Sequence, residues 1–178
     1  MWEIFDFFPQ VVSKAKGQLG YLLDTLNYFM LYGKTDFAKR ESSIRVYAQI
    51  VEQTLQTLKI LPDCEGAVVC QLLFQSLTGT NALDPFMEPL LDLTLKRLVT
   101  DPNPIELKKQ LCGIVMASMY YNASLTLQFL ESRQMTQSLL NDMHRSRSNF
   151  SDEYEQRFFI VGLCRMLQSP QLPASLQP

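Results

Sequence analysis

Carboxylates with helical spacing are the residues of this sequence best suited to bind a partner. Asp84, Glu88 and Asp92 recur every four positions, so they share one helix face and repel one another unless a cation or a basic partner lies alongside. The segment between Lys59 and Lys96 holds five acidic residues and no Lys or Arg. We predict that the three spaced acids contact a basic protein. The competing interpretation is an ordinary solvated helix surface, with Asp84 acting as a helix cap.

Side chains for catalysis are scarce. General acid–base chemistry most often uses histidine, and the sequence has one, His144, in a polar stretch with Arg145 and Arg147. This stretch is typical of an exposed flexible loop, with phosphate binding by the two arginines as an alternative. The glycines fit neither nucleotide-binding fingerprint. We predict that the protein is not an enzyme and uses no cofactor.

The cysteines are not spaced as metal ligands. None forms a Cys-x-x-Cys pair, and His144 is far from all four in sequence, so we expect no bound zinc or other metal. Free cysteines in a reducing compartment most often pack as small hydrophobic side chains. We expect this of Cys64, Cys70, Cys112 and Cys164.

Composition and charge exclude several classes of protein. The 178 residues are 47% hydrophobic, which is enough for a core. Sixteen basic and eighteen acidic residues give a net charge of -2, without the basic excess that nucleic acid binding needs. The first residues lack the positive segment of a secretory signal, so we expect a cytosolic or nuclear protein. The longest uncharged stretch, 110–130, has too many polar side chains for membrane insertion.

Helices must position these residues, because apolar side chains recur three or four positions apart almost throughout. We predict an all-α fold with helices at about 2–15, 18–32, 41–60, 64–78, 85–99, 104–121, 124–143 (with a break) and 152–168. The segment from Cys64 to Leu77 is apolar on nearly every side, which indicates a helix enclosed by neighbours. Tyr120 and Tyr121 are expected to pack at a helix end, with a peptide-stacking surface as the alternative.

Capping residues agree with these boundaries. We expect N-caps at Asp84, at Asn103 with Glu106 in a capping box, and at Ser151. We expect a break between helices at Asn122 and Ser124, and either a kink or a helix start at Pro9.

Pairing the helices in order gives four hairpins of about 40 residues, the period of HEAT-type repeats. A compact bundle is the alternative. We expect residues 1–168 to form the helical array and 169–178 a flexible proline-containing tail. Large apolar side chains crowd the first eight residues, notably Trp2, Ile4, Phe5, Phe7 and Phe8. Because a terminal repeat needs a polar outer face, this favours a fragment of a longer array or a dimer that buries this surface.

The order of these segments resembles a known family. The stretch LCGIVMASMYYNASLTLQFLE, residues 111–131, is similar to a Tyr-Tyr-Asn helix end and the following leucine-rich helix of the importin-β superfamily, in its importin seven and eight branch. Upstream, LDPFMEPLLDLTLKRL at 83–98 resembles the preceding helix, and the Trp2 helix, Tyr32-Gly33 and 44–58 occur in the same order. Downstream, FFIVGLCRML at 158–167 with Pro170 and Pro173 resembles a late helix and its exit. The similarity covers residues 1–173.

The resemblance implies the carboxy-terminal HEAT-repeat region of a nuclear import receptor. Such receptors carry cargo from cytoplasm to nucleus, bind the GTPase Ran in its GTP form through amino-terminal repeats, and contact phenylalanine-glycine nucleoporins. It implies a Ran site outside this chain, residence in cytoplasm, nucleus and nuclear pore, and basic cargo such as ribosomal proteins and histones. Asp84, Glu88 and Asp92 are then the candidate contacts to basic cargo. A self-contained helical adaptor or scaffold without a transport role is the alternative.

Overall fold

We describe a computed structural model for residues 7–14, 19–100, 104–145, 147–150, 152–170, 172–173 and 176. Within these ranges the chain is helical and contains no strand. The helices are α1 (Phe8–Lys14), α2 (Leu19–Ala38), α3 (Glu41–Leu55), α4 (Ile60–Ser76), α5 (Asp84–Val99), α6 (Ile105–Ser132), α7 (Thr136–Arg145), the short 3-10 helix η2 (Arg147–Asn149) and α8 (Glu153–Leu167).

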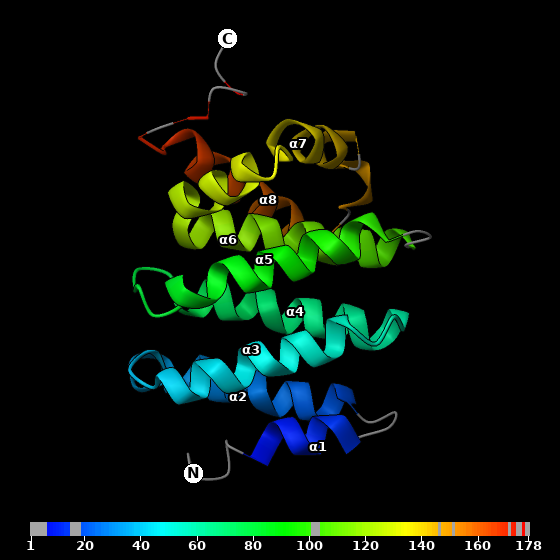
Figure 1. The fold of residues 1–178 in the computed structure, drawn as a ribbon, viewed down its shortest axis with the longest axis vertical. Helices are drawn as coiled ribbons and strands as arrows, with labels where there is room; N and C mark the ends of the chain where they lie inside the picture. Colours follow the sequence, from blue (N-terminus) through cyan, green and yellow to red (C-terminus); the bar gives the residue numbers. More distant parts are fainter. Residues whose placement is uncertain are drawn as a thin grey trace.

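The helices form two stacked layers (Figure 1). In one layer α1 packs on α3 and α3 on α5, while in the other α2 packs on α4, α4 on α6 and α6 on α8. The pairs α3–α4 and α5–α6 pack as hairpins that join the layers. A stack in which each hairpin contacts the next one along is typical of an α-solenoid. The predicted all-α, HEAT-like array of helix pairs is confirmed.

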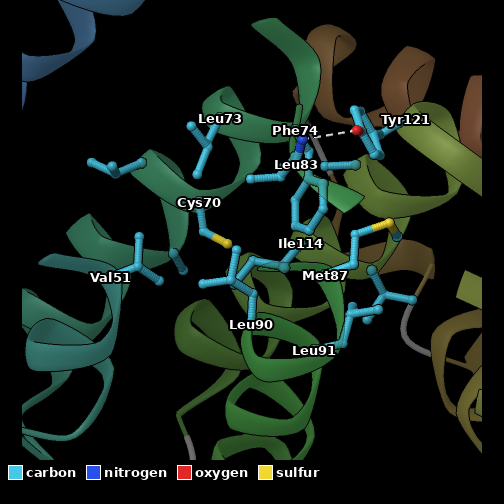
Figure 2. Packing of buried hydrophobic residues seen from close by; sticks show 14 of the residues in the cluster. Val51, Cys70, Leu73, Phe74, Leu83, Met87, Leu90, Leu91, Ile114 and Tyr121 are labelled. Atoms are coloured by element: carbon cyan, nitrogen blue, oxygen red, sulfur yellow. Dashed lines mark hydrogen bonds between the residues drawn. The ribbon is translucent and has the colours of Figure 1, made fainter. Parts of the chain in front are cut away.

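Helix α4 lies at the centre of the stack, as its apolar sequence predicts. It packs against α2, α3 and α6. Cys70, Leu73 and Phe74 of this helix are fully buried, and Figure 2 shows Cys70 pointing toward Leu90 of α5 and Phe74 lying beside Ile114 of α6. Full burial of one such large apolar side chain contributes about 1.5–3 kcal/mol. The core is therefore continuous from hairpin to hairpin.

The ends of three helices differ from the prediction. Helix α2 continues past Gly33 to Ala38. The helix predicted at 41–60 ends at Leu55, and the linker after it contains Leu58, whose positive φ of 56° is incompatible with a continuing helix. Leu58 is 67% exposed, so its place in the apolar stripe was coincidental. Helix α4 begins earlier than predicted, at Ile60, because Pro62 lies in its first turn, where an amide N–H is not required.

One of the predicted caps is wrong, and two others lie outside the described residues. Leu83 occupies the N-cap position of α5, and Asp84 is its first residue. Asn103 and Ser151 lie outside the described residues; Pro104 occupies the N-cap position of α6. Asp152 caps α8, where its carboxylate accepts a hydrogen bond of 2.6 Å from the backbone N–H of Tyr154. A carboxylate one residue from the predicted cap can satisfy the same amides.

Asn122 separates two limbs of α6, as predicted. Its backbone is not helical, with φ of -152° and ψ of 90°. Its side-chain oxygen accepts from the N–H of Leu125 at 3.2 Å, so it caps the second limb. The expected start of α1 near Pro9 is also confirmed, since α1 begins at Phe8.

The two ends of the stack were predicted to hold exposed apolar side chains and a flexible tail, respectively. Trp2, Ile4 and Phe5 lie outside the described residues, whereas Phe7 is 61% exposed and Phe8 is buried. At the other end, the Ser169 hydroxyl lies 3.2 Å from that of Ser124 in α6. The flexible tail stays a prediction, although its described residues contact α6.

Candidate functional site

The first acid of the predicted row, Asp84, binds within the chain. Its carboxylate accepts a hydrogen bond of 2.8 Å from the hydroxyl of Tyr121 in α6. The same hydroxyl accepts the backbone N–H of Leu83 at 3.0 Å, as Figure 2 shows. Burial raises the pKa of the Tyr121 phenol, and the Asp84 carboxylate raises it further. This tyrosine therefore stays neutral and joins the start of α5 to α6.

The other two acids of the row share a cation from the same chain. The guanidinium of Arg133, at the end of α6, lies 3.0 Å from Asp92 and 3.8 Å from Glu88. Lys96 lies 2.5 Å from Asp92 on the next turn of α5. The hydrogen bond from Lys96 lowers the pKa of the Asp92 carboxyl, and Arg133 acts in the same direction. The cation that the spacing requires is thus supplied internally.

The surface left to an external partner is centred on Glu88. Its side chain is 75% exposed, against 24% for Asp92. Arg133 is held in place by the ring of Phe129, whose centroid lies 5.3 Å from its guanidinium. The contact of Asp84, Glu88 and Asp92 with a basic partner stays a prediction, and Glu88 is the member of the row most accessible to one.

A buried ion pair removes one more acid from the surface. Asp63 of α4 is fully buried, and its carboxylate lies 2.7 Å from Nε of Arg97 in α5. The other oxygen of Asp63 accepts a hydrogen bond of 2.7 Å from the hydroxyl of Thr57. Asp63 is one of the five acids counted between Lys59 and Lys96, and the sequence does not mark its pairing because Arg97 is 34 positions away. The pair joins α4 to α5.

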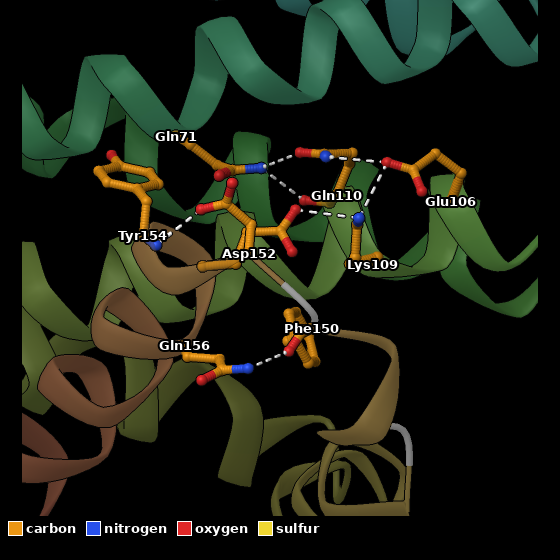
Figure 3. A network of polar contacts seen from close by, with 9 residues as sticks. Gln71, Glu106, Lys109, Gln110, Phe150, Asp152, Tyr154 and Gln156 are labelled. Atoms are coloured by element: carbon orange, nitrogen blue, oxygen red, sulfur yellow. Dashed lines mark hydrogen bonds and ion pairs between the residues drawn. The ribbon is translucent and has the colours of Figure 1, made fainter.

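Polar contacts attach α8 to α6 and α6 to α4 (Figure 3). Lys109 of α6 lies 3.0 Å from Glu155 of α8 and 3.1 Å from Glu106 of its own helix. Burial lowers the pKa of Lys109, but its hydrogen bonds to the two glutamates outweigh this and raise it. The side-chain amide of Gln71 donates to the backbone oxygen of Gln110 at 2.9 Å. These contacts position α4, α6 and α8 relative to one another.

The predicted packing of the tyrosine pair is confirmed. Tyr121 packs against Phe74 of α4, with ring centroids 5.9 Å apart. Tyr120 packs edge-on against Phe158 of α8 at 6.1 Å, and the guanidinium of Arg165 lies 5.6 Å from its ring. Both rings therefore hold helices of one layer together.

The histidine and cysteines depart in part from their predicted settings. His144 is exposed but lies in the last turn of α7, not in a loop, and its ring is 3.3 Å from Arg147. Cys70 and Cys112 are buried as predicted, Cys64 is half-buried, and the prediction for Cys164 is wrong, since it is exposed. Helix α8 turns Cys164 outward because α8 has a neighbour on one side. Across the ranges the structure describes, no three His, Cys, Asp or Glu side chains gather to hold a metal ion.

Comparison with known proteins gives one distant similarity. No family profile matches the chain, and no solved structure matches it. Importin-8 of Danio rerio is 22% identical over 123 residues, which cover 65% of this chain. The chain spans 12% of the length of that relative. The similarity and the two-layered helical stack together indicate a distant relationship to importin-β-like, HEAT-type proteins.

None of the helices in the described part of the chain combines the length and the apolar character needed to cross a bilayer.

The residues that sequence reasoning missed are Arg97 and Arg133, which come from other helices. The only local signal for them was the excess of acids that they neutralise.

Proposed function

We propose that this chain is part of a nuclear import receptor of the importin-β type, in its importin seven and eight branch. The observation that carries the proposal is the similarity to importin-8 of Danio rerio on a stack of helical hairpins. In this role the chain acts without catalysis, as a scaffold and a surface for protein cargo. The complete receptor moves between cytoplasm and nucleus and passes the nuclear pore.

The partners proposed for the complete receptor follow from the same relationship. They are basic protein cargo, Ran in its GTP form and phenylalanine-glycine nucleoporins, with the Ran site outside this chain. Electrostatic attraction steers a basic cargo to an acidic surface and weakens with salt. In this chain Glu88 is the most exposed acid of the α5 row, so it supports a cargo contact there.

The test is import of a defined cargo. In permeabilised cells, the complete receptor that contains this chain, carrying a fluorescent tag, is expected at the nuclear rim, and a purified histone is expected to enter nuclei in its presence and in a GTP-dependent manner. An acidic protein of similar size is the control cargo. Diffuse staining together with no histone uptake would overturn the proposal and favour a helical adaptor without a transport role.

The cargo contact on α5 is tested separately. Glu88→Lys is expected to weaken binding of the histone roughly tenfold at low salt, because one attraction is lost and one repulsion gained. Asp142→Lys, on the exposed surface of α7, is the matched control. Equal affinity of the wild type and Glu88→Lys for the histone would show that α5 is not part of the cargo-binding surface.

A further inference from the structure

The linker between α7 and α8 carries two arginines that the proposed cargo surface does not use. Arg145 is the last residue of α7, and Arg147, Ser148 and Asn149 form the short helix η2. These four residues are exposed, and η2 has no buried residue. A serine with an arginine three positions before it is the pattern that arginine-directed protein kinases recognise, because acidic side chains of the kinase pair with the guanidinium. The linker therefore joins a kinase recognition pattern to an accessible hydroxyl.

The structure separates this pattern from the other copies of it in the chain. Arg-x-x-Ser or Arg-x-x-Thr occurs four times in the sequence, ending at Ser43, Thr100, Thr136 and Ser148. Ser43 and Thr136 are buried, with 3% and 1% of their surface exposed. The arginine that precedes Thr100 is Arg97, which is itself buried in an ion pair. Of the four matches, the one that joins Arg145 to Ser148 leaves both the guanidinium and the hydroxyl exposed.

The backbone at Ser148 can be extended at low cost. A kinase binds its substrate in an extended conformation, so the acceptor segment must open locally. The N–H of Phe150 donates to the carbonyl of Arg147 at 3.2 Å, and hydrogen bonds of this 3-10 type have poor geometry. Phe150 itself is buried, with its ring 5.2 Å from that of Phe159 in α8. The residues before Phe150 can thus extend while α8 stays in place.

Ser42 offers a comparison within the same chain. It is exposed and follows Lys39 and Arg40, so its sequence also suits a kinase that recognises basic residues. However, it lies in the first turn of α3, and the next two residues, Ser43 and Ile44, are buried. Extending this segment would expose both of them and break the hydrogen bond of 3.1 Å from the N–H of Ile44 to the carbonyl of Arg40. Ser42 is therefore the poorer acceptor.

The charges of the linker suit a phosphoryl group. Nη1 of Arg147 lies 3.3 Å from Nε2 of His144, and within the described ranges no carboxylate pairs with Arg147. Arg145 pairs with Asp142 of its own helix at 3.9 Å. A phosphoryl group adds a charge of about -1.5 to -2 and three acceptor oxygens, which a guanidinium binds well. Modification of Ser148 would thus supply a counter-charge next to Arg147.

We propose that Ser148 is a phosphorylation site for a protein kinase that recognises arginine three positions before the acceptor. The hydroxyl oxygen of Ser148 attacks the γ-phosphorus of Mg²⁺-bound ATP and forms a new O–P bond, while the bond from that phosphorus to the β,γ-bridging oxygen breaks. The bridging oxygen leaves with the electron pair as part of ADP, and the serine proton passes to the base of the kinase. Arg145 supplies the guanidinium that the kinase recognises. The site goes beyond the proposed function and does not depend on a transport role.

The test is phosphorylation of the full 178-residue chain by an activated calmodulin-dependent protein kinase with Mg²⁺ and ATP, followed by mass spectrometry. Ser148 is expected to be the main site, and Ser148→Ala is expected to lower the rate of uptake at least tenfold. Arg145→Gln should also lower it roughly tenfold, because one charge-assisted contact with the kinase is lost. Ser42→Ala and Ser146→Ala are the matched controls and should leave the rate unchanged. Phosphate found mainly at another residue, or undiminished uptake by Ser148→Ala, would overturn the proposal.

Isolated peptides separate the effect of the pattern from that of the fold. Peptides of residues 37–46 and 142–151 each contain one Arg-x-x-Ser, and the kinase is expected to modify both. The intact chain is expected to be modified in the second segment alone, and circular dichroism under the same conditions checks that it is helical. If the peptide 142–151 is modified but the helical chain is not, the linker is closed to the kinase and the proposal is wrong. If neither is modified, the recognition through Arg145 is wrong.

Discussion

At the residue scale, one hydroxyl joins two helices. The Tyr121 hydroxyl donates to Asp84 and accepts from the N–H of Leu83. We expect Tyr121→Phe to lower the free energy of unfolding by about 1–3 kcal/mol, because the ring still packs while a buried N–H loses its acceptor. Urea denaturation measures the change. Tyr120→Phe, which alters a ring with similar neighbours, should change stability by less than about 0.5 kcal/mol. Equal effects of the two variants would contradict the bridging role.

The buried pair of Asp63 and Arg97 makes a second prediction. Arg97→Met leaves a fully buried carboxylate without its guanidinium and is expected to cost about 3–5 kcal/mol. Asp63→Asn in the same background removes the stranded charge and keeps an acceptor for Thr57, so it should recover part of that loss. Thermal and urea unfolding of the wild type, Arg97→Met and the double variant measure these changes in the free energy of unfolding. A double variant less stable than Arg97→Met would contradict the assignment.

Thiol reactivity should follow burial. Burial raises the pKa of the Cys112 thiol to about 12, and burial also raises that of Cys70. We expect a thiol reagent at pH 8 to modify Cys164 first, because it is exposed, and to reach the two buried cysteines only in denaturant. Mass spectrometry of the labelled protein gives the order, with Cys164→Ser as the control. Rapid labelling of Cys70 in the folded protein would contradict the packing of α4.

The sequence predicted the excess of acidic residues but not the arginines from other helices that neutralise them. The spacing of Asp84, Glu88 and Asp92 showed that a cation was needed, and spacing along one helix is local information. Arg133 and Arg97 reach the acids from other helices, so their roles depend on how the hairpins stack. Candidate sites built from several helices are therefore not readable from one segment.

At the element scale, a close approach of α3 and α4 depends on Gly66. A methyl group at this position would lie 2.0 Å from the Thr54 hydroxyl and 2.7 Å from its Cβ. Thr54 is buried, so it has no space to move. We expect Gly66→Ala to destabilise the protein by about 1–3 kcal/mol despite the better helix propensity of alanine.

Gly113→Ala is the matched control for this glycine. There the new methyl group would meet only the far end of the Gln71 side chain, which is flexible. We therefore expect a smaller loss than for Gly66→Ala in the same urea titration. A larger loss at Gly113 would show that the α4–α6 contact, and not the α3–α4 contact, is the tighter one.

The sequence predicted the helices themselves better than it predicted where they begin and end. Apolar periodicity identified α3, α5 and α8, because each buries one face. The ends of α3 and α4 were misplaced because the turn between them contains Leu58, an apolar residue in the left-handed region. Leucine is a strong helix former, so no composition rule marks such a turn. Asn122 was readable because its side chain caps the limb that follows it.

At the scale of the whole molecule, one layer of helices is continuous, and α7 packs beside it against α6. The α2–α4–α6–α8 layer is continuous through the tight contacts of α4, α6 and α8, while α7 contacts α6 and η2. Helix length and order predicted the repeats, since hairpins of about 40 residues stack by default. The weaker attachment of α7 was not predictable, because it arises from the course of the chain after α6.

This architecture predicts graded stability along the chain. In a linear array each hairpin is stabilised by its neighbours, so the ends open at a lower free energy than the centre. We expect hydrogen exchange to be slowest in α4, which is enclosed by α2, α3 and α6, and fastest in α7. Mass spectrometry of peptides from 67–76 and 137–145 measures the two rates. Gly66→Ala should accelerate exchange in α4 and leave α7 unchanged. Equal protection of α4 and α7 would instead mean that the helices unfold together as one bundle.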